Sequence, residues 1–194
     1  MADHMTSPLE RLMAGNRRYV EGVAERPHQD AARRVEVAGG QKPFAVVITC
    51  ADSRVPPEII FDCGLGDIFV IRSAGHVLDD AIIGTIEYAA EHLHVTLVVV
   101  VGHSNCGAVQ ATIDTGLQPG VIHKLLQYIA PAVEAARQQP GDLLDNAVRE
   151  NTRLTVARLR QSEPILAHLA EQGHLTIIGA VYDLHSGQIA PIGD

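Results

Sequence analysis

Cysteine and histidine side chains with the spacing of metal ligands follow two apolar, largely β-branched segments of the chain. Cys50 comes directly after residues 44–49, and His103 and Cys106 follow residues 95–101. If both segments are buried strands of one parallel sheet, their carboxyl ends meet at one edge and the three side chains surround one point. Zn²⁺ favours such nitrogen and sulfur ligands, and three protein ligands leave a fourth position open for chemistry. The sequence therefore predicts a catalytic zinc site with one ion per chain.

Asp52 and Arg54 lie close to the first of these ligands and carry opposite charges. If the guanidinium of Arg54 holds the Asp52 carboxylate through two parallel hydrogen bonds, the fourth zinc position is free for water. Zinc lowers the pKa of such a water from 15.7 to about 7, so that hydroxide is available near neutral pH. If the pair breaks, the carboxylate can take the fourth position itself. We interpret the two residues as a catalytic dyad that switches the site, which predicts a loss of activity at acid pH.

The elements around these motifs alternate between strand and helix, which is typical of an α/β fold. We expect a mostly parallel central β-sheet with an antiparallel edge strand, flanked by helices and preceded by an N-terminal helical arm. The expected strands cover residues 43–49, 67–72, 95–101, 175–182 and 188–190. The expected helices cover residues 8–22, 57–64, 79–92, 106–116, 121–138, 142–161 and 164–173, with a short one ending at 39–40.

Several single residues near the motifs carry expectations of their own. A helix that begins at Cys106 would lower the pKa of its thiol. Gly102 and Gly107 would let the backbone approach closely around the site. Cys63 has no partner motif, so we expect it to pack in the core. His76, in the loop after the second strand, is the remaining histidine that could belong to the site.

Composition limits the class of protein. The chain has 15 basic and 23 acidic residues and a net charge of −8, which argues against a nucleic-acid surface. Apolar runs stay well short of the ~20 residues of a membrane span. Three cysteines do not make a disulfide framework and favour a cytoplasmic protein that uses thiols for metal binding or catalysis. We expect one domain over residues 1–194, and we interpret residues 1–5 as a remnant of cloning.

Four motifs, taken in order, resemble those of the bacterial β-class carbonic anhydrases: residues 50–55, 71–75, 84–89 and 102–108. The resemblance extends over most of the chain. It implies a zinc lyase that hydrates carbon dioxide reversibly to bicarbonate and a proton through a zinc-bound hydroxide. In this family the three ligands and the acid–arginine dyad named above would carry the reaction.

The resemblance also implies an assembly of identical chains. A homodimer would be the smallest active unit, often doubled to a homotetramer, with N-terminal helices embracing the partner. Gln41, Phe69, Tyr88 and Gly107 would line the substrate pocket, some of them from the neighbouring chain.

One departure from the family pattern concerns a second site for bicarbonate. Members that are inhibited there carry Trp three residues before the first ligand, together with an Arg and a Tyr. Arg72 and Tyr182 match, but position 47 is Val. We therefore predict no such site, and a bicarbonate-soaked crystal with the ion between Arg72 and Tyr182 would contradict this.

Two other interpretations use the same zinc site. Relatives of this family hydrolyse carbonyl sulfide or carbon disulfide, and faster sulfide release than carbon dioxide turnover would favour that activity. Alternatively, zinc could stabilise a protein without catalysis. The Asp52–Arg54 pair argues against this second alternative, because a structural zinc site is usually closed by a fourth Cys or His.

Overall fold

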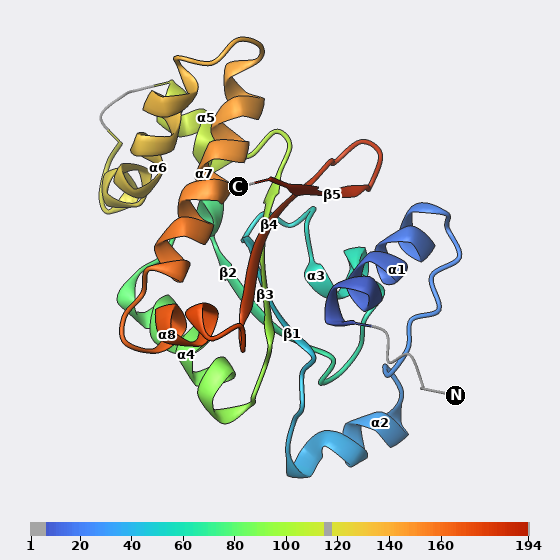
Figure 1. Cartoon of the computed structure of the whole chain (residues 1–194). Coiled ribbons are helices and arrows are strands. Elements are labelled where there is room, and N and C mark those ends of the chain that lie inside the picture. Colours follow the sequence, from blue (N-terminus) through green and yellow to red (C-terminus); the bar gives the residue numbers. More distant parts are fainter. Residues whose placement is uncertain (1–6, 115–117, 194) are drawn as a thin grey trace.

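A five-stranded sheet runs through the centre of the protein (Figure 1). The computed structural model describes residues 7–114 and 118–193. The strand order is β2-β1-β3-β4-β5, in which β1, β2, β3 and β4 are parallel and β5 is antiparallel to β4. The strands are β1 (Ala45–Cys50), β2 (Ile68–Ser73), β3 (Leu97–His103), β4 (Thr176–Tyr182) and β5 (Ile189–Ile192). The expected fold class is confirmed.

Helices cover both faces of the sheet, with α4 and α8 on one side and α1 and α3 on the other (Figure 1). Side chains cap several of them: Asp79 accepts a backbone N–H at the start of α4, and Asp142 does so at the start of α7. The α-helices are α1 (Pro8–Val20), α2 (Ala31–Glu36), α3 (Pro57–Ile60), α4 (Asp80–His92), α5 (Gly107–Ile113), α6 (Ile122–Ala136), α7 (Leu143–Arg160) and α8 (Ile165–Glu171). Two 3-10 turns are η1 (Val37–Gly39) and η2 (Ala74–His76).

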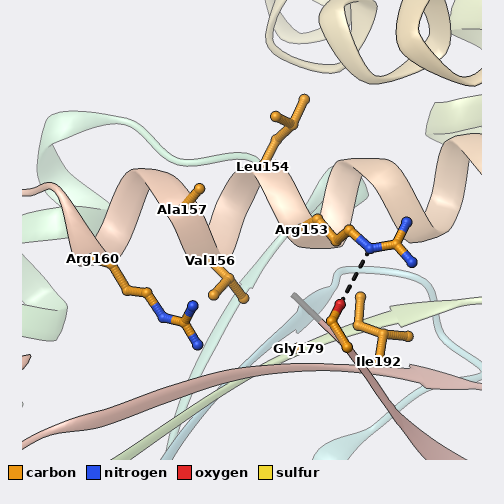
Figure 2. Close-up of a pocket in the computed structure, with 8 residues that line it drawn as sticks. Arg153, Leu154, Val156, Ala157, Arg160, Gly179 and Ile192 are labelled. Carbon is orange, nitrogen blue, oxygen red and sulfur yellow. Dashed lines mark hydrogen bonds between the residues drawn. The ribbon is translucent and has the colours of Figure 1, made fainter.

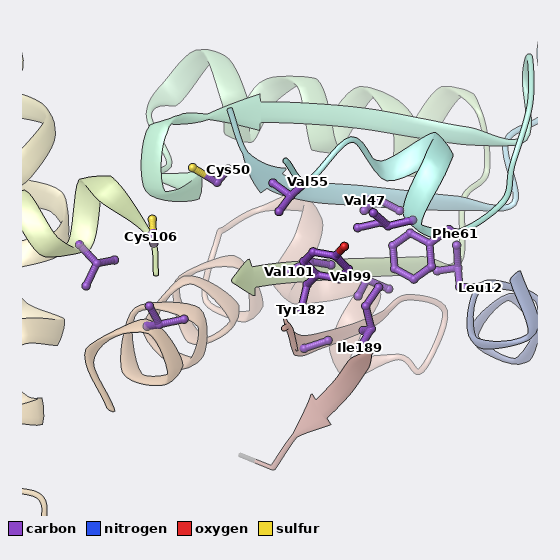
Figure 3. Close-up of a cluster of buried hydrophobic side chains, with 14 of the residues drawn as sticks. Leu12, Val47, Cys50, Val55, Phe61, Val99, Val101, Cys106, Tyr182 and Ile189 are labelled. Atoms are coloured by element: carbon purple, nitrogen blue, oxygen red, sulfur yellow. The ribbon is translucent and has the colours of Figure 1, made fainter. Parts of the chain in front are cut away.

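Strands β1 and β3 are buried along their whole length, which explains their continuous apolar sequence. Successive side chains point to opposite faces, so Val47 and Val99 belong to one hydrophobic cluster, whereas Val46 and Val98 belong to the other. Figure 3 shows the first cluster, which extends along the strands to the two cysteines of the predicted site. The core therefore fixes the strand ends from both sides.

Helix α3 is shorter than the sequence predicts, because the chain turns sharply after Ile60. Asp62 has a left-handed φ of 47°, and its buried carboxylate accepts the backbone N–H groups of Glu25 and Arg26 at 2.9 and 2.8 Å. These bonds tie the turn after α3 to the segment that contains Glu25 and Arg26. The predicted end of the helix at residue 116 and the interpretation of residues 1–5 lie outside the described residues.

Helix α1 is fastened to its own chain. Asn16 is buried, and its side-chain amide donates to the carbonyl oxygens of Ile60 and Gly187 at 3.0 and 2.9 Å, while its Oδ1 accepts the N–H of Ile189 at 3.0 Å. One helix face is therefore used within the chain. In the described part of the chain, no helix is both long enough and apolar enough to cross a membrane.

Candidate metal centre

The three predicted ligands converge at the carboxyl edge of the sheet. Strand β1 ends at Cys50, its neighbour β3 ends at His103, and Cys106 stands immediately before α5. Their candidate ligand atoms, two sulfurs and a ring nitrogen, all lie within 4.8 Å of one another, and all three residues are buried. Figure 3 shows Cys50 and Cys106 with their sulfur atoms at this end of the core. This group is suited to binding a metal ion.

The ring of His103 is oriented for such a role. Its Nδ1 lies 2.9 Å from the carbonyl oxygen of Ser104 and donates a hydrogen bond to it. Nε2 is therefore unprotonated and carries a free electron pair. Among the described residues, Nε2 of His103 is the one buried side-chain nitrogen or oxygen with no hydrogen-bond partner. A buried polar atom without a partner is costly unless something else satisfies it, and a metal ion would do so.

The two cysteines differ in acidity. Interaction with the Cys106 thiol is the main reason that the pKa of Cys50 is lowered, although burial opposes this shift. Backbone N–H groups of Gly75 and Asp52 also donate to Cys50 Sγ, at 3.2 and 3.4 Å. Cys50 is therefore the thiolate of the pair.

The start of α5 lowers the pKa of Cys106 as expected, through the N–H groups of Val109 and Ala108. The net shift is nevertheless upward, because the interaction with Cys50 and burial raise this pKa by more. Helix α5 has only seven residues, and a neighbouring thiolate within 4.8 Å has a larger effect than its first turn.

Asp52 and Arg54 form the predicted pair. Arg54 donates from Nε to Oδ1 at 2.9 Å and from Nη2 to Oδ2 at 2.7 Å, and its backbone N–H adds a third bond at 2.9 Å. These hydrogen bonds hold the pKa of Asp52 well below its ordinary value of 3.8, so the carboxylate is ionised. Asp52 Oδ2 lies 4.0 Å from His103 Nε2, so the carboxylate stands beside the ligand group while bound to Arg54.

Sequence reasoning missed the backbone support of this turn. Arg72, on β2, donates from Nε to the carbonyl oxygen of Cys50 at 3.0 Å and from Nη2 to that of Asp52 at 2.5 Å. The position of Arg72 at a strand end was a signal, but nothing in the sequence indicated that its targets are main-chain atoms. Tyr182, the other residue of the family's second bicarbonate pattern, lies with its hydroxyl 3.3 Å from that of Tyr19.

The four predicted pocket residues do not lie together at the ligand edge of this chain. Gly107 directly follows Cys106, whereas Gln41 is exposed in the loop before β1 and Tyr88 is half exposed on α4. Phe69 pairs with Val46, so it lies at the amino end of its strand, away from the ligand edge.

The two glycines beside the site behave differently. A Cβ on Gly102 would lie 2.4 Å from Thr152 Oγ1 and 3.2 Å from Val148 Cγ1, so the expected close approach is found there. Among the described residues of this chain, a Cβ on Gly107 would meet nothing within 4 Å, so no close approach is found at Gly107.

A separate cavity of about 170 Å³ lies between α7 and the β4–β5 edge (Figure 2). Val156, Gly179 and Ile192 line it, and Arg153 at its rim donates to the carbonyl oxygen of Gly193 at 3.2 Å. The cavity includes none of the predicted site residues.

The fold and the site together define an α/β protein with a candidate metal centre at the carboxyl edge of a parallel sheet. A family model described as "Carbonic anhydrase" matches residues 45–189. The chain belongs to the carbonic anhydrase family, as an enzyme of its β class, which confirms the resemblance found in the sequence.

Individual relatives agree with this assignment. The chain is 42% identical over 181 residues to "Carbonic anhydrase 2" of Mycobacterium tuberculosis, covering 91% of this chain and 87% of the relative. The structure of the β-carbonic anhydrase CcaA superimposes with a TM-score of 0.76 at 26% identity and covers 96% of both chains. A structure of one of two tetrameric β-carbonic anhydrases from the ascomycete Sordaria macrospora gives a TM-score of 0.74 at 26% identity, covering 93% of this chain and 94% of that one.

Proposed function

We propose that this chain catalyses the zinc-dependent, reversible hydration of carbon dioxide to bicarbonate and a proton. Family membership supports the class of reaction. The observation that carries the proposal is the unpartnered Nε2 of His103, buried beside two thiols of which one is a thiolate. A lone buried nitrogen facing two sulfurs has no structural purpose in a packed core, whereas it completes a three-ligand metal site.

Cys50, His103 and Cys106 would hold the zinc ion. Two thiolates and one dication make a formally neutral group, which suits the buried position of all three side chains. When bound, zinc supplies electrostatic activation of water near neutral pH. Zinc rather than a harder cation fits because sulfur ligands select borderline-soft metals.

Asp52 and Arg54 would serve as the catalytic dyad. Because the pKa of Asp52 is lowered, its carboxylate stays ionised and can accept a hydrogen bond from a water beside His103. Arg54 orients that carboxylate through its planar fork and keeps it from turning toward the ligand group. The dyad thus keeps one side of the ligand group accessible to substrate and water.

A second copy of the chain would complete the substrate pocket. Phe69 pairs with the residue four positions before Cys50, about 13 Å away along the strand at ~3.3 Å per residue. Phe69, Gln41 and Tyr88 would therefore line the pocket of a partner, whereas Gly107 lines that of its own chain. We propose a homodimer or a homotetramer, the latter supported by the tetrameric Sordaria proteins. Light scattering at micromolar concentration tests this, and a monomer with full activity would contradict it.

Two further proposals concern the chain as a whole. The sheet strands contribute to both hydrophobic clusters, which supports one domain over residues 1–194. Three free, buried cysteines support a reducing location such as the cytoplasm. Fractionation of the source cells tests the location, and recovery of the protein outside the cytoplasmic fraction would contradict it.

Stopped-flow hydration of carbon dioxide, combined with a zinc assay, tests the activity. Wild type should bind one zinc per chain and turn over, whereas Cys106→Ala should lose both zinc and activity. Cys63→Ala is the matched control, because Cys63 is equally buried but lies outside the ligand group. A zinc-loaded, inactive wild type would overturn the proposal, and faster turnover of carbonyl sulfide would reassign the substrate.

A further inference from the structure

A short loop behind Cys50 connects the ligand group to a distant helix. The loop follows β2 and contains Gly75 and His76, both buried. The N–H of Gly75 donates to Cys50 Sγ at 3.2 Å. Such a bond stabilises a thiolate and fixes its direction, so the orientation of one peptide group bears directly on a predicted ligand.

The Gly75 backbone adopts a conformation that another residue would not reach easily. Its φ is +61°, in the left-handed region. A Cβ at this position would lie 2.7 Å from Ile129 Cδ1 and 3.2 Å from Ala108 Cβ. The loop is therefore wedged between α5 and α6, but steric contact alone does not determine which way its peptide groups face.

Asn151, in the middle of α7, fixes the orientation of this loop through hydrogen bonds. It is only 4% exposed, and its Nδ2 donates to the carbonyl oxygen of Gly75 at 2.9 Å. The same Nδ2 lies 3.4 Å from His76 Nε2. Both amide hydrogens of Asn151 are thus directed at this loop, one at its main chain and one at its side chain.

The tautomer of His76 agrees with this arrangement. Burial lowers the pKa of His76 to about 4, so the ring is neutral at pH 7 and one of its nitrogens can accept. Thr155 donates its hydroxyl hydrogen to the carbonyl oxygen of Asn151 at 2.8 Å, so its oxygen is left to accept from His76 Nδ1 at 3.4 Å. Nε2 is then the acceptor for Asn151. Thr152 Oγ1 also lies 3.5 Å from Nε2, but its hydrogen is donated to the carbonyl oxygen of Val148 at 2.9 Å.

We propose that Asn151 is a positioning residue of the metal centre: it holds the Gly75–His76 peptide in place and so restrains the adjoining Ala74–Gly75 peptide, whose N–H is directed at Cys50 Sγ. The inference rests on the proposed metal binding by the two cysteines and His103. Removal of the Asn151 amide frees the Gly75–His76 peptide to rotate. The preceding peptide shares the Gly75 Cα, so its N–H loses part of the restraint that directs it at Cys50 Sγ. Cys50 then becomes a more basic and less well oriented ligand.

The test compares Asn151→Leu with Asn16→Leu in the full-length, cobalt-loaded protein. Asn16, on α1, is the matched control, since it is also 4% exposed and its amide also makes two hydrogen bonds as a donor, to two backbone carbonyl groups. Affinity for Co²⁺ is measured by competition with a chelator, and the sulfur-to-cobalt charge-transfer band is recorded. Leucine has the same number and branching of side-chain heavy atoms as asparagine, so both variants lose donors without opening a cavity.

Asn151→Leu should weaken cobalt binding about 10–100-fold and move the charge-transfer band to lower energy, as expected when a thiolate loses a hydrogen bond. Asn16→Leu should lower the melting temperature but leave affinity and band unchanged. Wild-type affinity and band in Asn151→Leu, or an equal loss in Asn16→Leu, would overturn the inference. Should Asn151→Leu not fold, Asn151→Ser, too short to reach Gly75, takes its place with the same expected shift. A wild type that binds no cobalt would overturn the metal proposal itself, and this inference with it.

Discussion

Replacement of Arg54 by alanine tests the assignment of the dyad most directly. The variant loses the two side-chain bonds to Asp52, at 2.9 and 2.7 Å, but keeps the backbone N–H bond at 2.9 Å. Hydrogen bonds between charged groups are among the stronger ones, but the Arg54 side chain is 54% exposed and solvent screens the pair. Loss of the two bonds should therefore change the fraction of chains with the carboxylate held away from the ligand group by a factor of only about 2–5.

Stopped-flow measurement of kcat, with zinc content determined on the same samples, gives the result. Arg54→Ala should retain its zinc and lose activity by up to that factor, because Asp52 Oδ2 has only 4.0 Å to travel to His103 Nε2. Arg54→Lys should recover little, since it restores the charge without the planar fork. The exposed Arg17, in the last turn of α1, provides the control substitution to alanine. Full kcat in zinc-loaded Arg54→Ala would refute the role of the pair.

Three further predictions concern stability and thiol chemistry. Gly102→Ala should lower the free energy of unfolding by ~1–3 kcal/mol, because its Cβ would lie 2.4 Å from Thr152 Oγ1; an unchanged denaturant midpoint would contradict this. Burial opposes ionisation of Asp62, but hydrogen bonds, led by the one from Arg18, outweigh it and lower its pKa below 3.8. This network therefore stabilises the fold above about pH 4 and less as the pH falls, so Arg18→Ala should flatten the acid limb of a stability–pH curve; an equally steep limb would count against it. In folded protein treated with a chelator, a thiol reagent should modify Cys50, whose pKa is lowered, but spare Cys63, whose pKa is raised to about 12 by burial; equal labelling of these two would exclude this account.

Much of the fold followed from the pattern of apolar residues. The β-branched run before Cys50 and the run before His103 predicted two buried strands, and both end within two residues of the expected positions. The end of α3 was not predictable, because Asp62 forms its bonds with Glu25 and Arg26, and such long-range partners leave no local pattern. The type of a secondary-structure element follows from its local sequence, whereas the point at which α3 ends depends on tertiary contacts.

The site, like the fold, has features that could be predicted from the sequence and features that could not. Convergence of Cys50, His103 and Cys106 could be predicted because adjacent parallel strands deliver their ends to one edge. The direction of the Cys106 pKa shift could not be predicted, since it depends on a sulfur atom that lies 56 residues earlier in the chain but within 4.8 Å in space. Asn151 was equally hidden: a polar residue within an amphipathic helix gives no indication that it faces Gly75.

The central position of β1 and β3 determines how fast the backbone amide protons next to the metal ligands exchange with solvent. Each of these strands has a hydrogen-bonded neighbour on both sides and an apolar layer on both faces. Amide protons in such strands exchange only when the whole domain opens, whereas edge strands and short helices open locally. Cys50 and His103 end these two strands, so fraying of the β5 edge or of α2 leaves them in place. The proposed metal ligands on these strands therefore belong to the part of the molecule that unfolds last.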